Sequence, residues 1–251
     1  MACTREALSA YLEDLLKPHQ FRDYCPNGLQ VEGAQQIAHL VTGVTASQAL
    51  LDAAIDVGAD AVLVHHGYFW RSEEAAVIGM KAQRLRTLMR ADINLYAYHL
   101  PLDWHGELGN NAMLGKLMGV EQPAPLDPAD PNLPLFMGSL PTPVGLQALG
   151  TELAEKLGRT PLIVGHGEVQ KLAWCTGAGQ HYIDRAVEAG ADVYITGEVS
   201  EQTIHVARER DICFVAAGHH ATERFGVQAV GERAASALGC THEYIEIENP
   251  A

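Results

Sequence analysis

The chain has 251 residues, of which 47% are hydrophobic, and its formal net charge is −14 at neutral pH. This length suits one large domain or two smaller ones, with enough apolar residues for a sizeable core. No apolar run approaches the roughly 20 residues that cross a bilayer, and no basic stripe is present to bind a phosphate backbone. We therefore expect no membrane partner and consider nucleic acid an unlikely one.

The N-terminal residues lack a signal-peptide pattern. Cysteine is odd in number and widely spaced, at positions 3, 25, 175, 213 and 240, and no C-x-x-C motif occurs. This usage favours a reducing cytoplasm and buried free thiols.

The first elements follow from apolar spacing. Leucines at helical intervals predict an amphipathic helix over 4–16, with Thr4 as its N-cap. A turn is expected at 26–28. Residues 40–44 predict a strand, and Thr45 with Gln48 forms a capping box that opens a helix through residue 56.

A short buried strand, 61–64, is followed directly by His65, His66 and Gly67. A helix is predicted over about 75–90 and a strand over 93–98, which leads into His99 and Asp103. A further helix is predicted over 110–118. Strands that alternate with helices are typical of a parallel sheet in an α/β fold.

Composition changes near residue 121, because seven prolines lie between 123 and 143. A helix (146–157) and a short strand (161–164) follow. We interpret 125–170 as a Pro-rich linker and small subdomain between a first α/β half, 1–124, and a second, 171–251.

The second half repeats the pattern of the first. The segment 41–43 resembles 175–177, 58–62 resembles 190–194, and 92–95 resembles 211–214. The segments that follow the last strand of each half also match, since His99-x-x-x-Asp103 in the first half resembles His219-x-x-x-Glu223 in the second. The repeat predicts two related βαβαβ halves in a three-layer α-β-α fold.

Imidazoles and carboxylates follow the predicted strands. If these strands share one sheet, the side chains lie together at its carboxyl rim. Such a set can hold two divalent ions, with Asp103 and Glu223 as bridging candidates. It fits iron, zinc, manganese or nickel without choosing among them. The residues are His65, His66, His99, Asp103, Glu198, His219, His220 and Glu223.

Structural roles are the alternative for each residue. Asp103 could cap a turn, and Glu223 falls in the first turn of a predicted helix over 221–238, where the helix dipole favours a carboxylate. His99 could orient a ligand without binding metal itself. His105 and His205 could contact substrate or lie on the surface.

Several ordered motifs resemble the family known as GTP cyclohydrolase I type 2 homologues, or the NGG-one-interacting-factor-three-like dinuclear-metal family. The resemblance covers nearly the whole chain. Its motifs are 25–33, Val64-His65-His66-Gly67, His99-x-x-x-Asp103, Thr196-Gly197-Glu198 and 218–223. It implies a three-layer α/β fold, a toroidal homohexamer and two metal ions per subunit. By motif position the implied metal ligands are His65, His66, Asp103, His219 and Glu223.

The residues and the resemblance together favour a dinuclear-metal-dependent hydrolase acting on a nucleotide or related heterocycle. The candidate catalytic residues are His99, His205 and His220. The alternative is a non-catalytic hexameric protein that binds metal or serves as a scaffold. A DNA-associated ring is disfavoured by the charge of −14.

Overall fold

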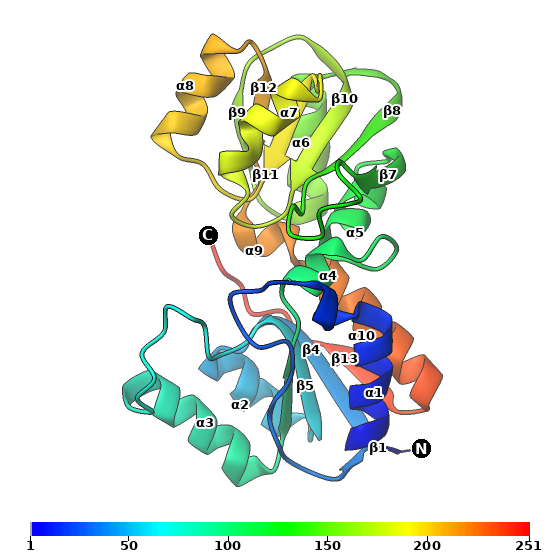
Figure 1. Ribbon diagram of the computed structural model, residues 1–251, viewed down its shortest axis with the longest axis vertical. Coiled ribbons are helices and arrows are strands. Elements are labelled where there is room, and N and C mark those ends of the chain that lie inside the picture. The colour runs from blue at the N-terminus through cyan, green and yellow to red at the C-terminus, as the bar shows by residue number, and fades with distance from the viewer. Residues whose placement is uncertain (1) are drawn as a thin grey trace. The chain divides into compact units, whose positions relative to one another are not determined.

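The computed structural model describes residues 2–251 and divides the chain into two units (Figure 1). The first unit comprises Met1–Leu102 and Val227–Glu248, and the second comprises Asp103–Gly226 and Asn249–Ala251. The chain passes between them within helix α4 (Leu100–Trp104) and helix α10 (Arg224–Leu238), and again after β13.

The first unit contains a five-stranded sheet in the order β13-β4-β5-β6-β2. Strands β13, β4, β5 and β6 are parallel, and β2 runs antiparallel to β6 at one edge. A small antiparallel pair, β1 and β3, joins the N-terminus to this unit. The bounds are β1 (Cys3–Thr4), β2 (Gly28–Val31), β3 (Gln36–Ile37), β4 (His39–Thr45), β5 (Ala61–His66), β6 (Asn94–Ala97) and β13 (Thr241–Tyr244).

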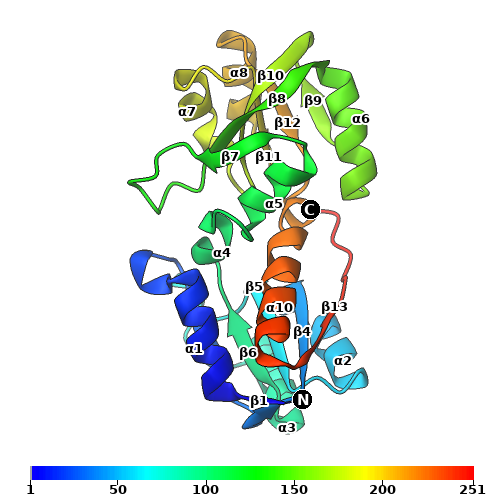
Figure 2. The same ribbon diagram turned by 90° about the vertical axis from the view of Figure 1, so that its right-hand side faces the viewer.

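Helices cover both faces of this sheet (Figures 1 and 2). Helices α2 (Gln48–Asp56) and α3 (Gly79–Ala91) pack on the face that carries Val41 and Val62. Helix α1 (Arg5–Leu16) and α10 lie on the other face. There the Thr42 side chain meets α10 closely, since a Cβ added at Gly231 would lie 2.4 Å from its methyl group. A short 3₁₀ helix, η1 (Pro18–Gln20), follows α1.

The second unit contains a six-stranded sheet in the order β7-β8-β10-β11-β12-β9. Strands β10, β11 and β12 are parallel, whereas β7, β8 and β9 run antiparallel to their neighbours. The strands are β7 (Glu121–Pro125), β8 (Phe136–Gly145), β9 (Leu162–Val164), β10 (Glu168–Cys175), β11 (Val193–Thr196) and β12 (Cys213–Ala216). The helices are α5 (Asn110–Leu117), α6 (Leu146–Leu157), η2 (Gln180–Tyr182), α7 (Ile183–Glu188), α8 (Glu201–Glu209) and α9 (His219–Thr222).

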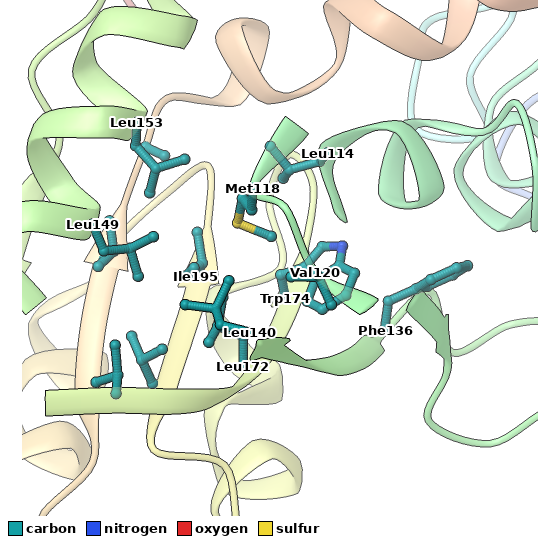
Figure 3. Packing of buried hydrophobic residues seen from close by; sticks show 14 of the residues in the cluster. Leu114, Met118, Val120, Phe136, Leu140, Leu149, Leu153, Leu172, Trp174 and Ile195 are labelled. Carbon is teal, nitrogen blue, oxygen red and sulfur yellow. The ribbon is translucent and has the colours of Figure 1, made fainter. Parts of the chain in front are cut away.

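Side chains of β10 alternate between two cores, as a strand covered on both faces requires. Leu172 and Trp174 pack with leucines of α5 and α6 (Figure 3), whereas Ala173 and Cys175 pack with α7 and α8. Trp174 is fully buried, and its Nε1–H donates to the Asn111 carbonyl at 2.9 Å. Each unit is therefore a three-layer α-β-α arrangement, which confirms the predicted fold class.

The two sheets share a repeated backbone device. Asp60 accepts hydrogen bonds from the backbone N–H groups of Ala38 and His39 at the start of β4, at 2.7 and 3.0 Å. Asp192 does the same for Gln170 and Lys171 in β10, at 2.9 and 2.7 Å. The strand triplets β4-β5-β6 and β10-β11-β12 are thus equivalent, as the sequence repeat predicts. The predicted match of 41–43 with 175–177 is two residues out of register, because the pairing aligns Val41 with Ala173.

Two predicted helix boundaries are wrong. The N-cap of α2 is Ser47, whose hydroxyl accepts from the Leu50 N–H at 3.2 Å, whereas Thr45 ends β4. The helix predicted over 221–238 is broken at Glu223, which separates α9 from α10. The N-cap at Thr4 is confirmed, because its hydroxyl accepts from the Ala7 N–H.

The Pro-rich segment is part of a sheet and not a linker. Strands β7 and β8 contain several of its prolines, and their pairings have register shifts. Strand β7 lies at the edge of the sheet. Proline lacks an N–H, and it is tolerated in a sheet at edges and bulges. Sequence cues for a linker and for such an edge hairpin are therefore alike.

The units also differ from the predicted halves, 1–124, 125–170 and 171–251. Helix α5 and β7 join the second unit, while α10 and β13 return to the first, where Thr241 pairs with His39. The strands thus form two main sheets, and the expectation of one shared carboxyl rim is wrong. Within residues 2–251 no helix has the length and apolar character of a membrane span.

Candidate metal-binding residues

Both histidines of the pair lie within β5 rather than beyond its end. His65 is fully buried, and its Nδ1 lies 3.0 Å from the Tyr98 carbonyl oxygen, so Nδ1–H donates to it. The His66 Nδ1 lies 3.1 Å from the Thr45 hydroxyl. The two rings are nonetheless close, with centroids 4.5 Å apart, although neighbours in a strand alternate faces.

His99 lies just after β6 and completes a cluster of three imidazoles in the first unit. Its ring centroid is 5.1 Å from that of His65 and 6.0 Å from that of His66. Its Nδ1 lies 2.7 Å from Oδ1 of Asp23, a carboxylate that is only 6% exposed. Metal-ligating histidines are commonly oriented through their second nitrogen in this way.

Asp23 accepts four hydrogen bonds. The donors are the Tyr24 N–H at 2.6 Å, the Asn27 amide at 2.9 Å, His99 Nδ1 at 2.7 Å and the Leu100 N–H at 2.8 Å. Burial alone would raise the pKa of Asp23, but hydrogen bonds and the charge of His99 lower it below its usual value. Asp23 is therefore the anchor of His99.

In the second unit, Asp103 lies in α4 and is 5% exposed. Its Oδ1 accepts from the Asn110 amide at 2.9 Å and from the Thr176 hydroxyl at 3.2 Å. Both donors are neutral groups, so the hydrogen bonds bring no compensating positive charge to the carboxyl. A buried carboxylate held by neutral donors still favours a cation close by.

Glu223 and His219 form a second pair in this unit. Glu223 is 3% exposed, and His219 Nε2 lies 3.3 Å from its Oε2. His219 Nδ1 lies 2.7 Å from Glu198 Oε1. Burial lowers the pKa of His219, but Glu223 and Glu198 more than offset this and raise it to about 9. Gly177 makes room for Glu223, since a Cβ there would lie 2.1 Å from its Oε1.

Cys175 lies in the same region but is not a suitable ligand. Burial, followed by the charges of Asp103 and Glu223, raises the pKa of its thiol well above the usual value. The thiol therefore stays protonated, and only the thiolate binds metal well. All five cysteines are free, and three of them are buried.

Ligand atoms converge within each unit. One ligand atom from each of His65, His66 and His99 lies within 4.8 Å of the others. In the second unit the same limit holds between Glu223 and Asp103 and between Glu223 and His219. With Nδ1 of these histidines facing an oxygen, Nε2 is the nitrogen suited to a metal. The donor set fits divalent cations.

The remaining predicted residues are placed differently. His205 lies on α8 with a side chain 60% exposed, 3.9 Å from Glu201. His220 lies in α9, where its backbone N–H donates to the Ala251 carbonyl. His105 Nδ1 accepts from the backbone N–H of Leu108 at 3.0 Å, which is a turn-capping role.

Sequence reasoning missed the residues that orient the histidines. Asp23 and Thr45 were assigned no part in the site, although they hold His99 and His66. The signal available was the position of Asp23, two residues before the motif 25–33 begins. The segments His99–Asp103 and His219–Glu223, which the sequence repeat matched, are one residue out of register. The pairing of β6 and β12 with their neighbours makes Asn94 equivalent to Cys213, so His99 is equivalent to Gly218 and not to His219.

Known proteins resemble this chain along its whole length. A family model described as Duf34/NIF3 (NGG1p interacting factor 3) matches residues 3–250. A Pseudomonas aeruginosa protein named GTP cyclohydrolase 1 type 2 homolog is 52% identical over 249 residues, 98% of this chain and 99% of its own. A Yersinia pestis protein of the same name is 54% identical over 247 residues, covering 97% and 98%.

Solved structures agree. One titled protein ybgI, of unknown function, matches with a TM-score of 0.94 and 49% identity, covering 99% of this chain and 100% of its own. TTHA1606 from Thermus thermophilus matches with a TM-score of 0.91 and 31% identity over the same shares. The chain belongs to the Duf34/NIF3 (NGG1p interacting factor 3) family.

Proposed function

We propose that this protein is a metal-dependent hydrolase that acts on a nucleotide or a related heterocycle. The observation that carries the proposal is the set of oriented histidines and buried carboxylates. His65, His66 and His99 each have Nδ1 at 2.7–3.1 Å from an oxygen in the first unit. Asp103 and Glu223 are 5% and 3% exposed in the second.

Five residues are proposed as ligands of two divalent ions: His65, His66, Asp103, His219 and Glu223. Divalent ions supply activation of water for attack on an electrophilic carbon and stabilise the negative charge that develops. The oxygen acceptors at each Nδ1 fix the ring orientations in advance. Iron, zinc, manganese and nickel all suit mixed nitrogen and oxygen ligands.

His99 is the best placed of the three candidate catalytic histidines. Its Nδ1 faces Asp23, so Nε2 can accept a proton from an attacking water and return it to a leaving group. His205 is mostly exposed on α8, and His220 is a further candidate beside the ligand His219. The name GTP cyclohydrolase 1 type 2 homolog of the relatives supports a guanine nucleotide as the first substrate to test.

Metal content tests the ligand set. We expect two divalent ions per chain in the purified protein and a loss of at least one in Asp103→Asn and in Glu223→Gln. His181→Gln is the matched control, because His181 is an exposed histidine in η2. Full metal occupancy in both carboxylate variants would contradict the assignment.

Turnover tests the activity. Metal-loaded protein is incubated with GTP and a panel of nucleotides, and products are followed by chromatography and absorbance. Hydrolysis that requires metal and is lost in Asp103→Asn supports the proposal. If loaded protein binds two ions and leaves every nucleotide intact, the hydrolase is refuted and a non-catalytic metal-binding or scaffold protein takes its place.

We further propose that the chain acts as a toroidal homohexamer in the cytoplasm, where reducing conditions suit its free thiols. Light scattering should then give six times the 27.1 kDa of one chain. A monomer or dimer at micromolar concentration would contradict this assembly.

A further inference from the structure

Two aromatic side chains flank His99 in the first unit, and neither has a role in the metal set. The Tyr24 ring centroid lies 6.3 Å from that of His99 at an interplanar angle of 61°. The Trp70 centroid lies 5.0 Å from it at 81°. The planes of both rings are therefore steeply inclined to the plane of the imidazole, and both rings lie beside it.

The segments that carry Tyr24 and Trp70 are joined by hydrogen bonds. Gln30 donates to the carbonyls of Pro26 and Tyr68, at 2.8 and 3.1 Å, and accepts from the Tyr68 N–H at 2.7 Å. The Arg71 N–H donates to the Tyr24 carbonyl at 2.8 Å. The backbone bond of Arg71 and the side-chain bonds of Gln30 to Tyr68 link the segment 24–30 to the segment 67–73 without using the aromatic rings.

The loop that carries Trp70 has an unusual and well-supported conformation. Phe69 has φ +65°, a left-handed value that is uncommon for a bulky residue. Glu73 accepts from the N–H groups of Phe69 and Trp70, at 2.7 and 3.2 Å, which holds this turn. The Trp70 indole N–H donates to the Gly67 carbonyl at 3.2 Å. Such strained positions, when over-determined by neighbours, cluster at ligand sites.

Exposure distinguishes Tyr24 from a core aromatic. Its side chain belongs to a residue that is 60% exposed, although it contacts the imidazole cluster. A tyrosine held in place by its backbone and left open to solvent offers a ring face to a planar ligand. Aromatic side chains bind nucleobases through such faces, with little preference among bases, because every base has a π-face.

We propose that Tyr24 and Trp70 form a stacking site for a planar heteroaromatic base, which sets the substrate class beside His99. This inference rests on the proposed function for its biological meaning, and it names residues that select the substrate. Hydrogen bonds hold the backbone at Tyr24 and the indole ring of Trp70 before the ligand arrives, so little ordering of the loops is needed on binding. Phosphate recognition is not assigned to these residues.

The experiment measures binding by calorimetry on the full chain as purified, and again after chelation of metal. The probes are GTP, ATP and UTP, with inorganic tripolyphosphate as the probe that lacks a base. Matched pairs isolate the ring: Tyr24→Phe against Tyr24→Leu, and Trp70→Phe against Trp70→Leu. The backbone bonds of Tyr24 remain in both of its variants, and both Trp70 variants lose the same indole N–H.

We expect the Leu variants to bind at least one nucleotide about 5- to 150-fold more weakly than wild type, which is the range for stacking of one base. The Phe variants should stay within a few fold, and tripolyphosphate binding should not change. Base binding should also quench the fluorescence of Trp70, and Trp70→Phe should abolish that quench.

Three results would overturn the inference. The first is that wild type binds all nucleotides and tripolyphosphate with equal affinity. The second is that Tyr24→Leu and Trp70→Leu bind nucleotides as wild type does. The third is that the Leu variants weaken tripolyphosphate binding as much as nucleotide binding. Thermal unfolding of each variant shows that it is folded, and Tyr24 keeps the test open if Trp70→Leu fails to fold. Base binding without turnover refutes only the hydrolase, and metal-dependent turnover unaffected by both Leu variants refutes only the stacking site.

Discussion

Replacement of Asp23 by asparagine should both destabilise the first unit and release His99. The carboxylate uses each oxygen twice: Oδ1 accepts from Tyr24 and His99, and Oδ2 accepts from Asn27 and Leu100. An asparagine side chain has one oxygen and one NH₂ group, so in either orientation two donors face a donor.

The magnitude follows from these two lost bonds. A hydrogen bond to a charged group contributes about 1.5–3 kcal/mol, so two are worth about 3–6 kcal/mol. Asn27 cannot rotate to compensate, because its own Oδ1 accepts from the His99 N–H at 2.7 Å. We expect Asp23→Asn to lower the free energy of unfolding by about 3 kcal/mol, the lower end, since His99 is 17% exposed and water can replace part of the loss.

Urea unfolding followed by circular dichroism measures this loss. Asp52→Asn is the matched control, because Asp52 is exposed on α2 and accepts from the Gln48 amide, four residues away, at 2.8 Å. Its effect should stay within about 0.5 kcal/mol. A double-mutant cycle of Asp23→Asn with His99→Phe should give a coupling of about 1.5–3 kcal/mol. A cost below about 1 kcal/mol with no coupling would refute the anchoring role of Asp23.

Three further outcomes are expected. Removal of metal by a chelator should lower the unfolding temperature of wild type, as measured by calorimetry. If the free metal concentration before chelation was 100 times the Kd, the loss is equivalent to about 2.7 kcal/mol. Glu223→Gln should respond little to the chelator. Gly67→Ala should lower the free energy of unfolding in urea by about 1–3 kcal/mol, because a Cβ at Gly67 would lie 2.2 Å from Gln30 Oε1. Gly106→Ala should be nearly neutral, because a Cβ there would meet nothing within 4 Å. Burial lowers the pKa of His242, so the unfolded chain binds the proton first and the free energy of unfolding should fall as pH drops below about 6.5. The slope is at most about 1.4 kcal/mol per pH unit, and it is smaller for a half-exposed ring. This slope should shrink in His242→Gln but not in the exposed control His19→Gln.

Local features were predictable from the sequence. The amphipathic helix with its cap at Thr4 and the helix over 146–157 agree with α1 and α6, since both depend on spacing and neighbours along the chain. The repeat at Asp60 and Asp192 was visible for the same reason. Each residue bonds backbone groups at the start of an adjacent strand, a role that any copy of the motif must keep.

Long-range pairing was not predictable. Nothing near residue 241 indicates that it pairs with His39, two hundred residues earlier, yet that pairing returns β13 to the first sheet. The prolines at 123 and 125 resemble a linker, because proline avoids sheet interiors and the sequence does not show that β7 is an edge. The anchor of His99 was missed similarly, since Asp23 lies 76 positions away in the chain.

The duplicated frame places different side chains at equivalent strand ends of the two units. In the register of β5 with β4 and of β11 with β10, Ala61 corresponds to Val193, so His65 corresponds to Gly197 and His66 to Glu198. Gly197 has no room for a side chain, because a Cβ there would lie 2.6 Å from the Gly177 carbonyl oxygen. The backbone at that position is therefore packed against its neighbour in one copy and supports a buried imidazole in the other. Gly197→His should therefore prevent the second unit from folding, as circular dichroism would show, because the added side chain would meet the Gly177 carbonyl oxygen.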